Sequence, residues 1–516
     1  MSKKSSVDRA LAVTGRIAGT VVLVTAVGFV GYWGLVPAPV PTTAVAPLGI
    51  EVAPGLQSSA CPGQLILPPA DATNPSFNPA PVPAQGAARI FVADGGDLKV
   101  GQFGTDVPLT PGQPQGLEAA GELLVDQDTS AGLWAQLTPG AEPIQPTLTG
   151  LSYSLVTDGD ARGLAVGQCA SPTTDTWLIG GSTVVGNTTH LVLQNPSATT
   201  AQVEVQVWGA NGKVERPGST VILNPGTSRE LDLGGLAPNQ RRTAVRVLTS
   251  GAAINSYLQH TQLQGFTPQG TDWVQGSDAP AATQVVTGLN LEESELGSGQ
   301  GAVLRLLSPD VSATVSLTFY DEEGQARVPG LSSVELVAGE VLDVALDGLA
   351  EGSWSIVAQG TAPITGGALV PRTGLAGDLD ATQRRDTSWI PARSAPTQSQ
   401  LFTFDPQWNT SLTLFAPAAP ATATWVELVQ RTPSGTELNS TKLNVAGEQT
   451  QRVTLTPADS TEAAIFELQV PLGLEMYASF EVSQVQPDGE VFSVLTPLPS
   501  STDGGLIKII DPAMGH

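Results

Sequence analysis

One pattern recurs three times along the chain and constrains its fold more than any other feature. It consists of a short apolar run, a turn with proline, an alternating run and a turn with glycine. The three copies are LVLQNPSATTAQVEVQVWGANGKV (191–214), LRLLSPDVSATVSLTFYDEEGQAR (304–327) and LTLFAPAAPATATWVELVQRTPSGTEL (412–438). Alternation of apolar and polar residues is typical of half-buried strands, so each copy predicts a pair of strands joined by turns.

The spacing of the turn residues indicates tandem domains. In each copy a glycine follows the proline by thirty residues, as in Pro196 and Gly226, Pro309 and Gly339, and Pro417 and Gly447. Successive prolines lie 113 and then 108 residues apart, and a tryptophan accompanies each unit, at Trp177, Trp273 and Trp389. Units of this length with several short strands are typical of immunoglobulin-like β-sandwiches, whereas solenoid and propeller repeats are shorter. We expect three sandwiches, at residues 171–281, 282–395 and 396–516.

The segment before the three predicted sandwiches is also predicted to be β-structure. Residues 86–170 show the same alternation without aligned proline and glycine, which predicts an N-terminal β region that is a partial or diverged sandwich. No amphipathic helix of more than three turns is evident after residue 86, so the predicted fold class is an all-β ectodomain. A chain of 516 residues is too long for one core and agrees with three or four domains.

The N-terminal segment predicts a membrane anchor. Residues 17–36, IAGTVVLVTAVGFVGYWGLV, carry no charge, and a helix of that length spans about 30 Å, the thickness of the bilayer core. Basic residues precede this run, whereas none occurs between Val36 and Arg89. By the positive-inside rule, residues 1–16 form a cytoplasmic tail and the C-terminal domains are extracytoplasmic. We expect a single-pass protein of the cell membrane, attached through residues 17–36.

Two other uses of the N-terminus are alternatives to an uncleaved signal anchor. A cleaved signal peptide would use AVA at residues 44–46, but the apolar run is longer than that of a signal peptide and Pro47 would follow the cut. A lipoprotein would be modified at Cys61, which lies far from the apolar run and lacks the preceding leucine of such a site. Both observations favour the anchor.

Residues 37–85 and the two cysteines predict how the anchor joins the first domain. The segment is dominated by proline, alanine, serine and threonine, which favours an extended stalk without a packed core. Cys61 and Cys169 both lie on the exported side, so they predict a disulfide that ties the stalk to the base of the first complete sandwich. Two free buried thiols are the alternative. A catalytic cysteine would need a nearby histidine or other positive group, and the chain has only three histidines.

Charge and motifs exclude several classes of function. The formal net charge is −25. A surface this acidic repels phosphate backbones and anionic lipids, so we expect no nucleic-acid partner. His190 and His260 lack an evident third metal ligand. The Asp-rich stretches 124–132 and 157–163 favour Asx turns over calcium loops, and GSGQG at 297–301 lacks the context of a phosphate loop. We therefore predict no catalytic, metal or cofactor site.

Two aromatic residues are candidates for recognition. In VEVQVW and VSLTFY the valines, the leucine and the phenylalanine take the inward face, which leaves Trp208 and Tyr320 outward at nearly equivalent positions. Such rings stack on a sugar or pack between domains, and packing between domains is the commoner outcome.

Several stretches together resemble a known family. They are TWLIGGSTVVGNTTHLVLQNPSATTAQVEVQVWGANG, the upstream Cys169, LNPGTSRELDLGGLAP and the N-terminal anchor, with residues 169–260 as the core of the likeness. The chain is similar to an actinobacterial family of membrane-anchored exported proteins of unknown function, domain-of-unknown-function family 5719. The resemblance brings no catalytic residues. It implies a role near envelope glycan assembly, because members tend to be encoded beside a membrane glycosyltransferase.

These observations predict a non-enzymatic, membrane-tethered scaffold or interaction module of the cell envelope, with a membrane glycosyltransferase or a cell-wall glycan as its partner. The alternative is a carbohydrate-binding β-sandwich protein. Aromatic rings lining one groove would favour a glycan ligand, and flat apolar patches at domain ends would favour a protein partner.

We predict that residues 17–36 remain in the mature protein, because the apolar run is longer than a signal peptide and Pro47 disfavours cleavage after AVA. N-terminal sequencing of protein extracted from membranes should start before residue 17. A start at Pro39 or Pro47 would contradict the anchor.

Overall fold

The structure is a computed structural model of the chain. It describes residues 48–52, 55–68, 82–93, 96–104, 120–125, 131–139, 147–215, 220–376, 381–418, 424–432, 434–456, 464–498 and 505–509. Strands dominate these ranges, and the only helix within them is the short α2 (Leu233–Leu236). The all-β prediction is therefore confirmed. No helix within the described residues is long and apolar enough to cross a membrane. The predicted anchor (17–36) and cytoplasmic tail (1–16) lie outside these ranges.

The chain divides into two compact units. The smaller one combines the two chain ends, where β1 (Leu48–Val52) and β34 (Gly505–Ile509) pair as a two-stranded sheet. The larger unit spans residues 53–505 and contains the remaining strands. The modules and sites described below all belong to this larger unit.

The second module (175–274) shows the repeated architecture completely. Its eight main strands are, in order, β9 (Asp175–Ile179), β10 (Asn187–Gln194), β11 (Ala201–Gly209), β13 (Thr220–Leu223), β14 (Ser228–Asp232), β15 (Ala244–Ser250), β16 (Asn255–Gln264) and β17 (Thr267–Val274), with the short β12 (Gly212–Lys213) after the third. If these eight are numbered within the module, one sheet has the order 4-3-6-1 and the other 5-2-7-8.

Alternation of side chains builds the core between these two sheets. In β11, Val203, Val205 and Val207 are buried and Glu204 is exposed, as expected for a strand with one face against a core. Their partners include Leu191 of β10 on the opposite sheet, so the two sheets pack face to face. The module is therefore a β-sandwich.

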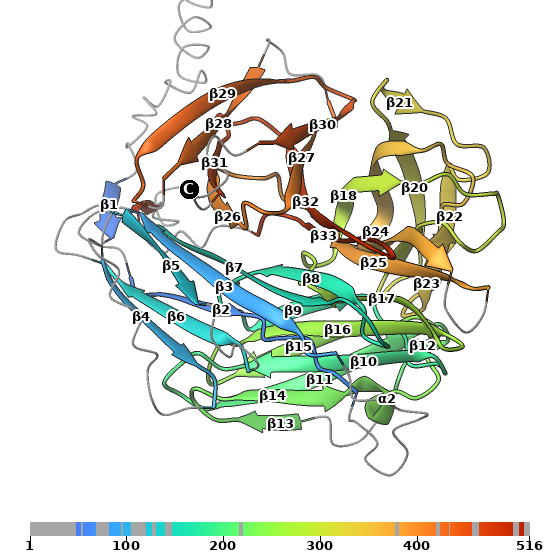
Figure 1. Cartoon of the computed structure of the whole chain (residues 1–516), viewed down its shortest axis with the longest axis horizontal. Coiled ribbons are helices and arrows are strands. Elements are labelled where there is room, and N and C mark those ends of the chain that lie inside the picture. The colour runs from blue at the N-terminus through green and yellow to red at the C-terminus, as the bar shows by residue number, and fades with distance from the viewer. Residues whose placement is uncertain are drawn as a thin grey trace, which may run out of the picture. The chain divides into compact units, whose positions relative to one another are not determined.

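The same strand order recurs in three further modules (Figure 1). The N-terminal module (57–168) contains β2 (Gln57–Cys61), β3 (Gln85–Ala93), β4 (Asp97–Gln102), β5 (Ala120–Val125), β6 (Leu133–Thr138), β7 (Thr147–Val156) and β8 (Gly163–Gln168). Its sheets, β4-β6-β2 and β5-β3-β7-β8, correspond to 3-6-1 and 5-2-7-8.

The third module (281–391) contains β18 (Ala281–Leu291), β19 (Val303–Leu307), β20 (Ala313–Tyr320), β21 (Gln325–Ala326), β22 (Ser333–Leu336), β23 (Val341–Ala345), β24 (Gly352–Ala376) and β25 (Gln383–Pro391). The long β24 supplies strand 6 with its first half, which pairs β20, and strand 7 with its second half, which pairs β19. One continuous strand thus joins the two sheets.

The fourth module (400–495) contains β26 (Gln400–Phe404), β27 (Asn409–Phe415), β28 (Thr424–Arg431), β29 (Glu437–Val445), β30 (Thr450–Leu455), β31 (Ala464–Gln469), β32 (Tyr477–Gln486) and β33 (Gly489–Leu495). Its sheets, β29-β28-β31-β26 and β30-β27-β32-β33, again have the orders 4-3-6-1 and 5-2-7-8. The sequence repeat therefore marks a repeated topology.

This topology refines one prediction and corrects two. The modules are β-sandwiches, but the first strand pairs with the sixth and the seventh with the second, whereas an immunoglobulin constant domain has sheets ABED and CFG, so the connectivity differs from that of a constant domain. The N-terminal β region begins at residue 57 rather than 86, and its described strands follow the common order. Trp177 lies on a first strand, whereas Trp273 and Trp389 lie on eighth strands, so the three tryptophans do not mark one position.

The predicted stalk is wrong for residues 55–68. β2 is the first strand of the N-terminal module, and Ala60 and Cys61 are fully buried. Residues beyond β2 are held against the second module, because Gly63 N donates to the Tyr257 hydroxyl and Ile66 N donates to Gln259 Oε1. A composition rich in small residues and proline still supports a packed strand when neighbouring modules supply the apolar surface.

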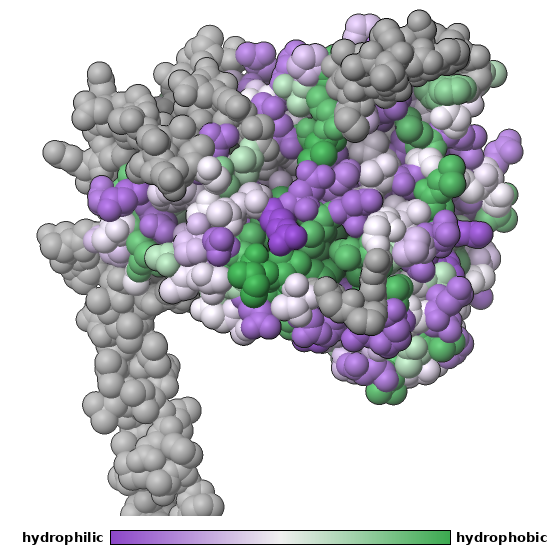
Figure 2. Space-filling model, turned by 90° about the horizontal axis from the view of Figure 1, so that it is seen from below, coloured by the Kyte–Doolittle hydropathy of each residue, from purple (hydrophilic) through white to green (hydrophobic). Residues whose placement is uncertain are grey.

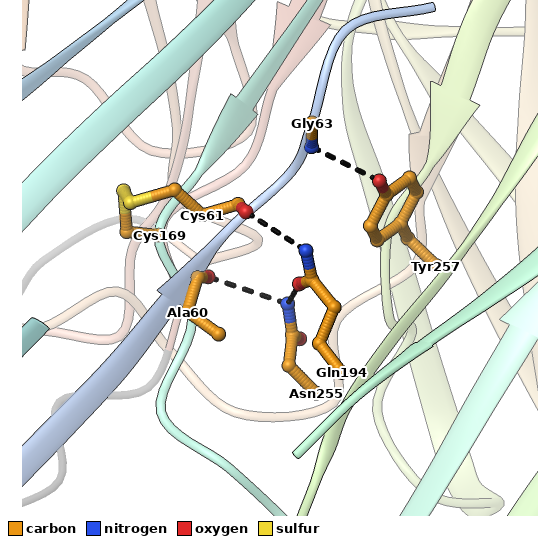
Figure 3. Close-up of a disulfide and its surroundings, with 7 residues drawn as sticks. All are labelled: Ala60, Cys61, Gly63, Cys169, Gln194, Asn255 and Tyr257. Carbon is orange, nitrogen blue, oxygen red and sulfur yellow. Dashed lines mark hydrogen bonds between the residues drawn. A yellow bond between two sulfur atoms is a disulfide. The ribbon is translucent and has the colours of Figure 1, made fainter. Parts of the chain in front are cut away.

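The disulfide between Cys61 and Cys169 is confirmed, but it closes one module (Figure 3). It joins the first strand of the N-terminal module to the residue that directly follows its last strand. Ala60 and Ala170 reinforce this closure by donating to each other's carbonyls, both at 2.9 Å. The second module also binds this strand, because Gln194 Nε2 donates to the Cys61 carbonyl and Asn255 Nδ2 to that of Ala60.

We predict that replacing both cysteines, as Cys61→Ser with Cys169→Ser, lowers the free energy of unfolding by up to about 4 kcal/mol, because the bond closes a long loop in the unfolded chain. The sequence separation of the two residues is 108. Urea unfolding of the variant and the wild type measures the difference. Equal unfolding midpoints would show that the crosslink adds no stability.

Candidate functional site

The eighth strands of the four modules meet and form a buried polar hub. These strands are β8, β17, β25 and β33, which lie close together in Figure 1. Hydrogen bonds between side chains and backbone join them across the module boundaries. Four chain segments far apart in the sequence are thus held at one place.

Glycine permits the close approach of two of these strands. Gly270 of β17 has φ +111°, a conformation that side chains disfavour. A Cβ atom there would lie 2.4 Å from the Thr387 nitrogen of β25. Gly163 is similarly restricted, because a Cβ would lie 2.6 Å from the Thr271 carbonyl oxygen. Any larger residue at these positions would push the strands apart.

Asp272 on β17 is the first of two buried carboxylates in the hub. Its Oδ2 accepts from the Ser388 hydroxyl at 2.9 Å and from Trp389 N at 2.8 Å, both on β25. Its Oδ1 accepts from the Ser493 hydroxyl of β33 at 3.0 Å. Burial raises the pKa of Asp272 well above its usual value, and these hydrogen bonds oppose that rise.

Asp386 on β25 is the second buried carboxylate. It accepts from Leu164 N of β8 at 3.3 Å and from Phe492 N of β33 at 2.8 Å. Burial raises its pKa to about 7, against its backbone hydrogen bonds and the nearby Arg162 guanidinium. The charge of Asp386 also raises the pKa of Asp272. The two acids therefore form an electrostatically coupled pair.

Arg162 connects the N-terminal module to the fourth module at the edge of the hub. Its side chain is fully buried, and its Nε and Nη2 donate to the two carboxylate oxygens of Asp488 at 2.7 and 2.9 Å. A bidentate pair of this kind has the geometry that gives arginine–carboxylate contacts their strength. Because Arg162 precedes β8 and Asp488 precedes β33, the pair links the first module to the last.

His260 lies between the second and third modules. Its Nδ1 accepts from the Trp389 indole nitrogen at 3.1 Å, and Arg305 lies over the Trp389 ring at 4.8 Å from the centroid. Burial and the charge of Arg305 lower the pKa of His260 to about 3, so this histidine is neutral. His190 instead approaches Glu230 at 2.8 Å. No group of three potential metal ligands occurs within the described residues.

The hydrogen bonds of the hub hold the modules together. Asp272 and Asp386 are 1% and 0% exposed, so no substrate reaches them in this conformation. Asp272 Oδ1 and Oδ2 and Asp386 Oδ2 accept hydrogen bonds from other modules, and Asp386 Oδ1 accepts from the adjacent Thr387 N. Neither acid was predicted from the sequence, although both lie beside tryptophans that accompany the repeat. Asp272 directly precedes Trp273, and Asp386 lies three residues before Trp389.

The two aromatic residues singled out from the sequence lie between modules. Trp208 is 4% exposed and stacks on Trp177, with ring centroids 5.1 Å apart, against Leu307 and Val341 of the third module. Tyr320 is 7% exposed and packs on Phe415 of the fourth module. Of the two roles expected for these rings, the structure shows packing between domains.

The third module contains a cavity of about 540 Å³. The loop 292–301, which includes the GSGQG turn, lines it together with Arg385. Asp347 shapes the turn, because its carboxylate accepts from Gly299 N at 2.9 Å and Gly301 N at 2.6 Å. The turn therefore serves as a structured loop between β18 and β19.

The surface of the molecule offers further contact sites. The face drawn in Figure 2 carries polar residues around a group of apolar ones. The large apolar side chains exposed within the described ranges belong to several modules and are Leu56, Val185, Ile222, Phe266, Leu296, Val311, Val337, Leu375, Trp425, Leu438, Leu472 and Val485. Such residues are available to a partner, unlike those of the hub.

The fold and hub define a class of protein built from tandem β-sandwich modules around a buried polar centre. Residues 126–456 match the model of a family described as a family of unknown function (DUF5719). The match covers more than half of the chain, so the protein belongs to this family. No curated protein matches it. A solved structure titled "Biofilm associated protein - BSP domain" has 8% identity over 90% of this chain and 100% of that chain, but its TM-score of 0.12 supports no inference.

We predict that the free energy of unfolding of Asp272→Asn decreases toward low pH relative to that of the wild type, so that the variant loses stability there. The folded protein holds the Asp272 proton at pH values where the unfolded carboxyl, with a pKa of 3.8, has lost it. This acid thus stabilises the fold at low pH, and the contribution is lost as pH rises from about 4 toward the folded pKa. The asparagine side chain fits this site. The Ser493 hydroxyl, which donates to Asp272 Oδ1, can instead accept a hydrogen bond from the amide nitrogen.

Urea unfolding between pH 4 and pH 7 measures this effect. The variant-minus-wild-type difference should change by up to about 1.4 kcal/mol per pH unit, the value for one proton. His260 contributes in the opposite direction in both proteins, so it cancels in the comparison. Asp158→Asn, at an exposed turn, is the matched control. Parallel pH profiles for Asp272→Asn and the wild type would contradict a raised pKa.

Proposed function

We propose that this protein is a non-enzymatic scaffold or interaction module of the cell envelope. In this proposal residues 17–36 anchor it in the cytoplasmic membrane, and the β-sandwich modules lie outside the cell. They present surface to an envelope partner, either a membrane glycosyltransferase or a cell-wall glycan. The Cys61–Cys169 disulfide supports an oxidising, extracytoplasmic location.

The enclosure of the hub is the single observation that carries this proposal. General acid-base catalysis needs a titratable group within reach of a substrate. Asp272, Asp386 and His260 have strongly shifted pKa values, but all three are buried between modules and engaged by neighbouring residues. Their shifts follow from burial in a structural interface. Recognition by exposed surface is then the function best supported.

The alternative of glycan binding through Trp208 and Tyr320 loses its support. Both rings are buried by the next module along the chain, so neither can stack on a sugar while the modules remain packed. A glycan-binding role would have to use other residues.

The test is co-purification from detergent-solubilised membranes with the full-length protein as bait. We expect a membrane glycosyltransferase or a cell-wall polymer to be enriched, and we expect no sugar to be released when the bait is incubated with envelope glycans. Bait lacking residues 1–36 should leave the membrane fraction. Turnover of a glycan, abolished by a single carboxylate-to-amide substitution, would overturn the scaffold proposal. Recovery of the bait without either partner would also count against it.

A further inference from the structure

The β29-β28-β31-β26 sheet of the fourth module is open on part of its outer face. Its inner face contributes Val426, Leu428 and Phe466 to the module core. On the outer face, Phe91 of the N-terminal module packs on Leu401 and Ile465. This cover lies on the side of the sheet formed by β26 and β31, and Val429 of β28, on the same face, is also buried. The first half of β28 and the strand β29 continue the face beyond it.

Trp425 lies on this open part and is 51% exposed. Because its neighbour Val426 faces the core, Trp425 and Glu427 share the outer face. The register places Asn444 opposite Trp425, and Lys442 opposite Glu427. Residues opposite each other in an antiparallel pair project to the same side of the sheet. The outer face therefore carries an indole ring opposite an amide, with a carboxylate and an amine at the next outward-facing pair.

Further polar groups extend this surface across β31 and β29. Gln469 lies opposite Glu427, and the Ser440 hydroxyl donates to the Glu427 carboxylate. Arg431 forms an ion pair with Glu467 on the same face. We define the Trp425 face as Trp425, Glu427, Lys442, Asn444 and Gln469.

We propose that the Trp425 face binds an uncharged carbohydrate. The indole supplies a flat apolar platform for the C–H face of a sugar ring, and the surrounding amide, amine and carboxylate groups are donors and acceptors for its hydroxyls. The charges of Glu427 and Lys442 balance each other, although the whole chain carries a net charge of −25. A face without net charge favours neither an anionic nor a cationic polymer, so we expect its ligand to be an uncharged polymer.

The size of the apolar area argues against a protein partner at this face. A stable protein interface buries about 800 Å² on each partner and has an apolar centre. On the Trp425 face one ring is apolar and its four companions are polar, which suits one or two sugar residues. A sugar-sized contact of this kind gives weak affinity at a single site.

This inference deepens the proposed function by choosing the glycan as the partner class. The two can fail separately. If the protein binds an oligosaccharide but recovers no partner from membranes, the scaffold role is wrong and the Trp425 site stands. If a glycosyltransferase co-purifies but no oligosaccharide binds, the scaffold role stands and the Trp425 site is wrong.

The experiment titrates the full-length protein with linear hexasaccharides of glucose, mannose, galactose and N-acetylglucosamine, and follows binding by calorimetry and tryptophan fluorescence. We expect at least one neutral hexasaccharide to bind and to be weakened at least tenfold by Trp425→Ala. Trp425→Phe should retain binding within about threefold, because it keeps an aromatic platform. Heparin, as an anionic probe, should not bind at this face.

The matched control is Phe266→Ala, which removes another exposed aromatic ring from the hairpin between β16 and β17 and should leave binding unchanged. Because Trp425 is half exposed, the alanine variant should unfold at the wild-type temperature, so that lost binding reports the site. Absence of binding by all four hexasaccharides would overturn the proposal. So would equal affinity of the wild type and Trp425→Ala.

Discussion

The carboxylate of Asp272 is the interaction on which the arrangement of the modules depends. It accepts hydrogen bonds from Ser388 and Trp389 of the third module and from Ser493 of the fourth. The Ser493 hydroxyl in turn accepts from Val166 N of the N-terminal module at 3.2 Å. One side chain of the second module thereby connects all four. A buried acid destabilises the folded state unless its hydrogen bonds are satisfied. Loss of any one of these contacts therefore weakens the whole arrangement of modules.

This hub determines which surfaces remain for function. The eighth strand of every module is buried there, and aromatic residues such as Trp208 and Tyr320 cover the boundaries between successive modules. Most of the chemically distinctive side chains are therefore used for cohesion. In the proposed function, recognition uses the outer faces of the sheets, where the Trp425 face combines an exposed ring with hydrogen-bonding groups. The disulfide has the same cohesive role, because it fixes the strand that carries the contacts to Gln194 and Asn255.

Much of the fold was predictable from local pattern. The thirty-residue interval between proline and glycine and the alternating runs predicted repeated strands, and the fourth module follows the order of the second and third. Strand pairing was not predictable, because the first and seventh strands have the same alternation and the pattern does not say which sheet each joins. The stalk prediction failed at β2 for a related reason. A segment of five residues gains its apolar environment from partners distant in the sequence, here Leu133 and Cys169.

The sequence by itself determined the all-β class, the repeat, the cysteine pair and the acidic charge, since each depends on residue type and on spacing along the chain. Only the tertiary structure decided that Asp272 and Asp386 are buried together, that Trp208 and Tyr320 are covered, and that Trp425 is open. Burial is a property of what packs against a residue. In this chain the packing partners of the hub come from four modules, with residues 166 and 493 in contact across 327 positions of sequence. No local pattern carries that information.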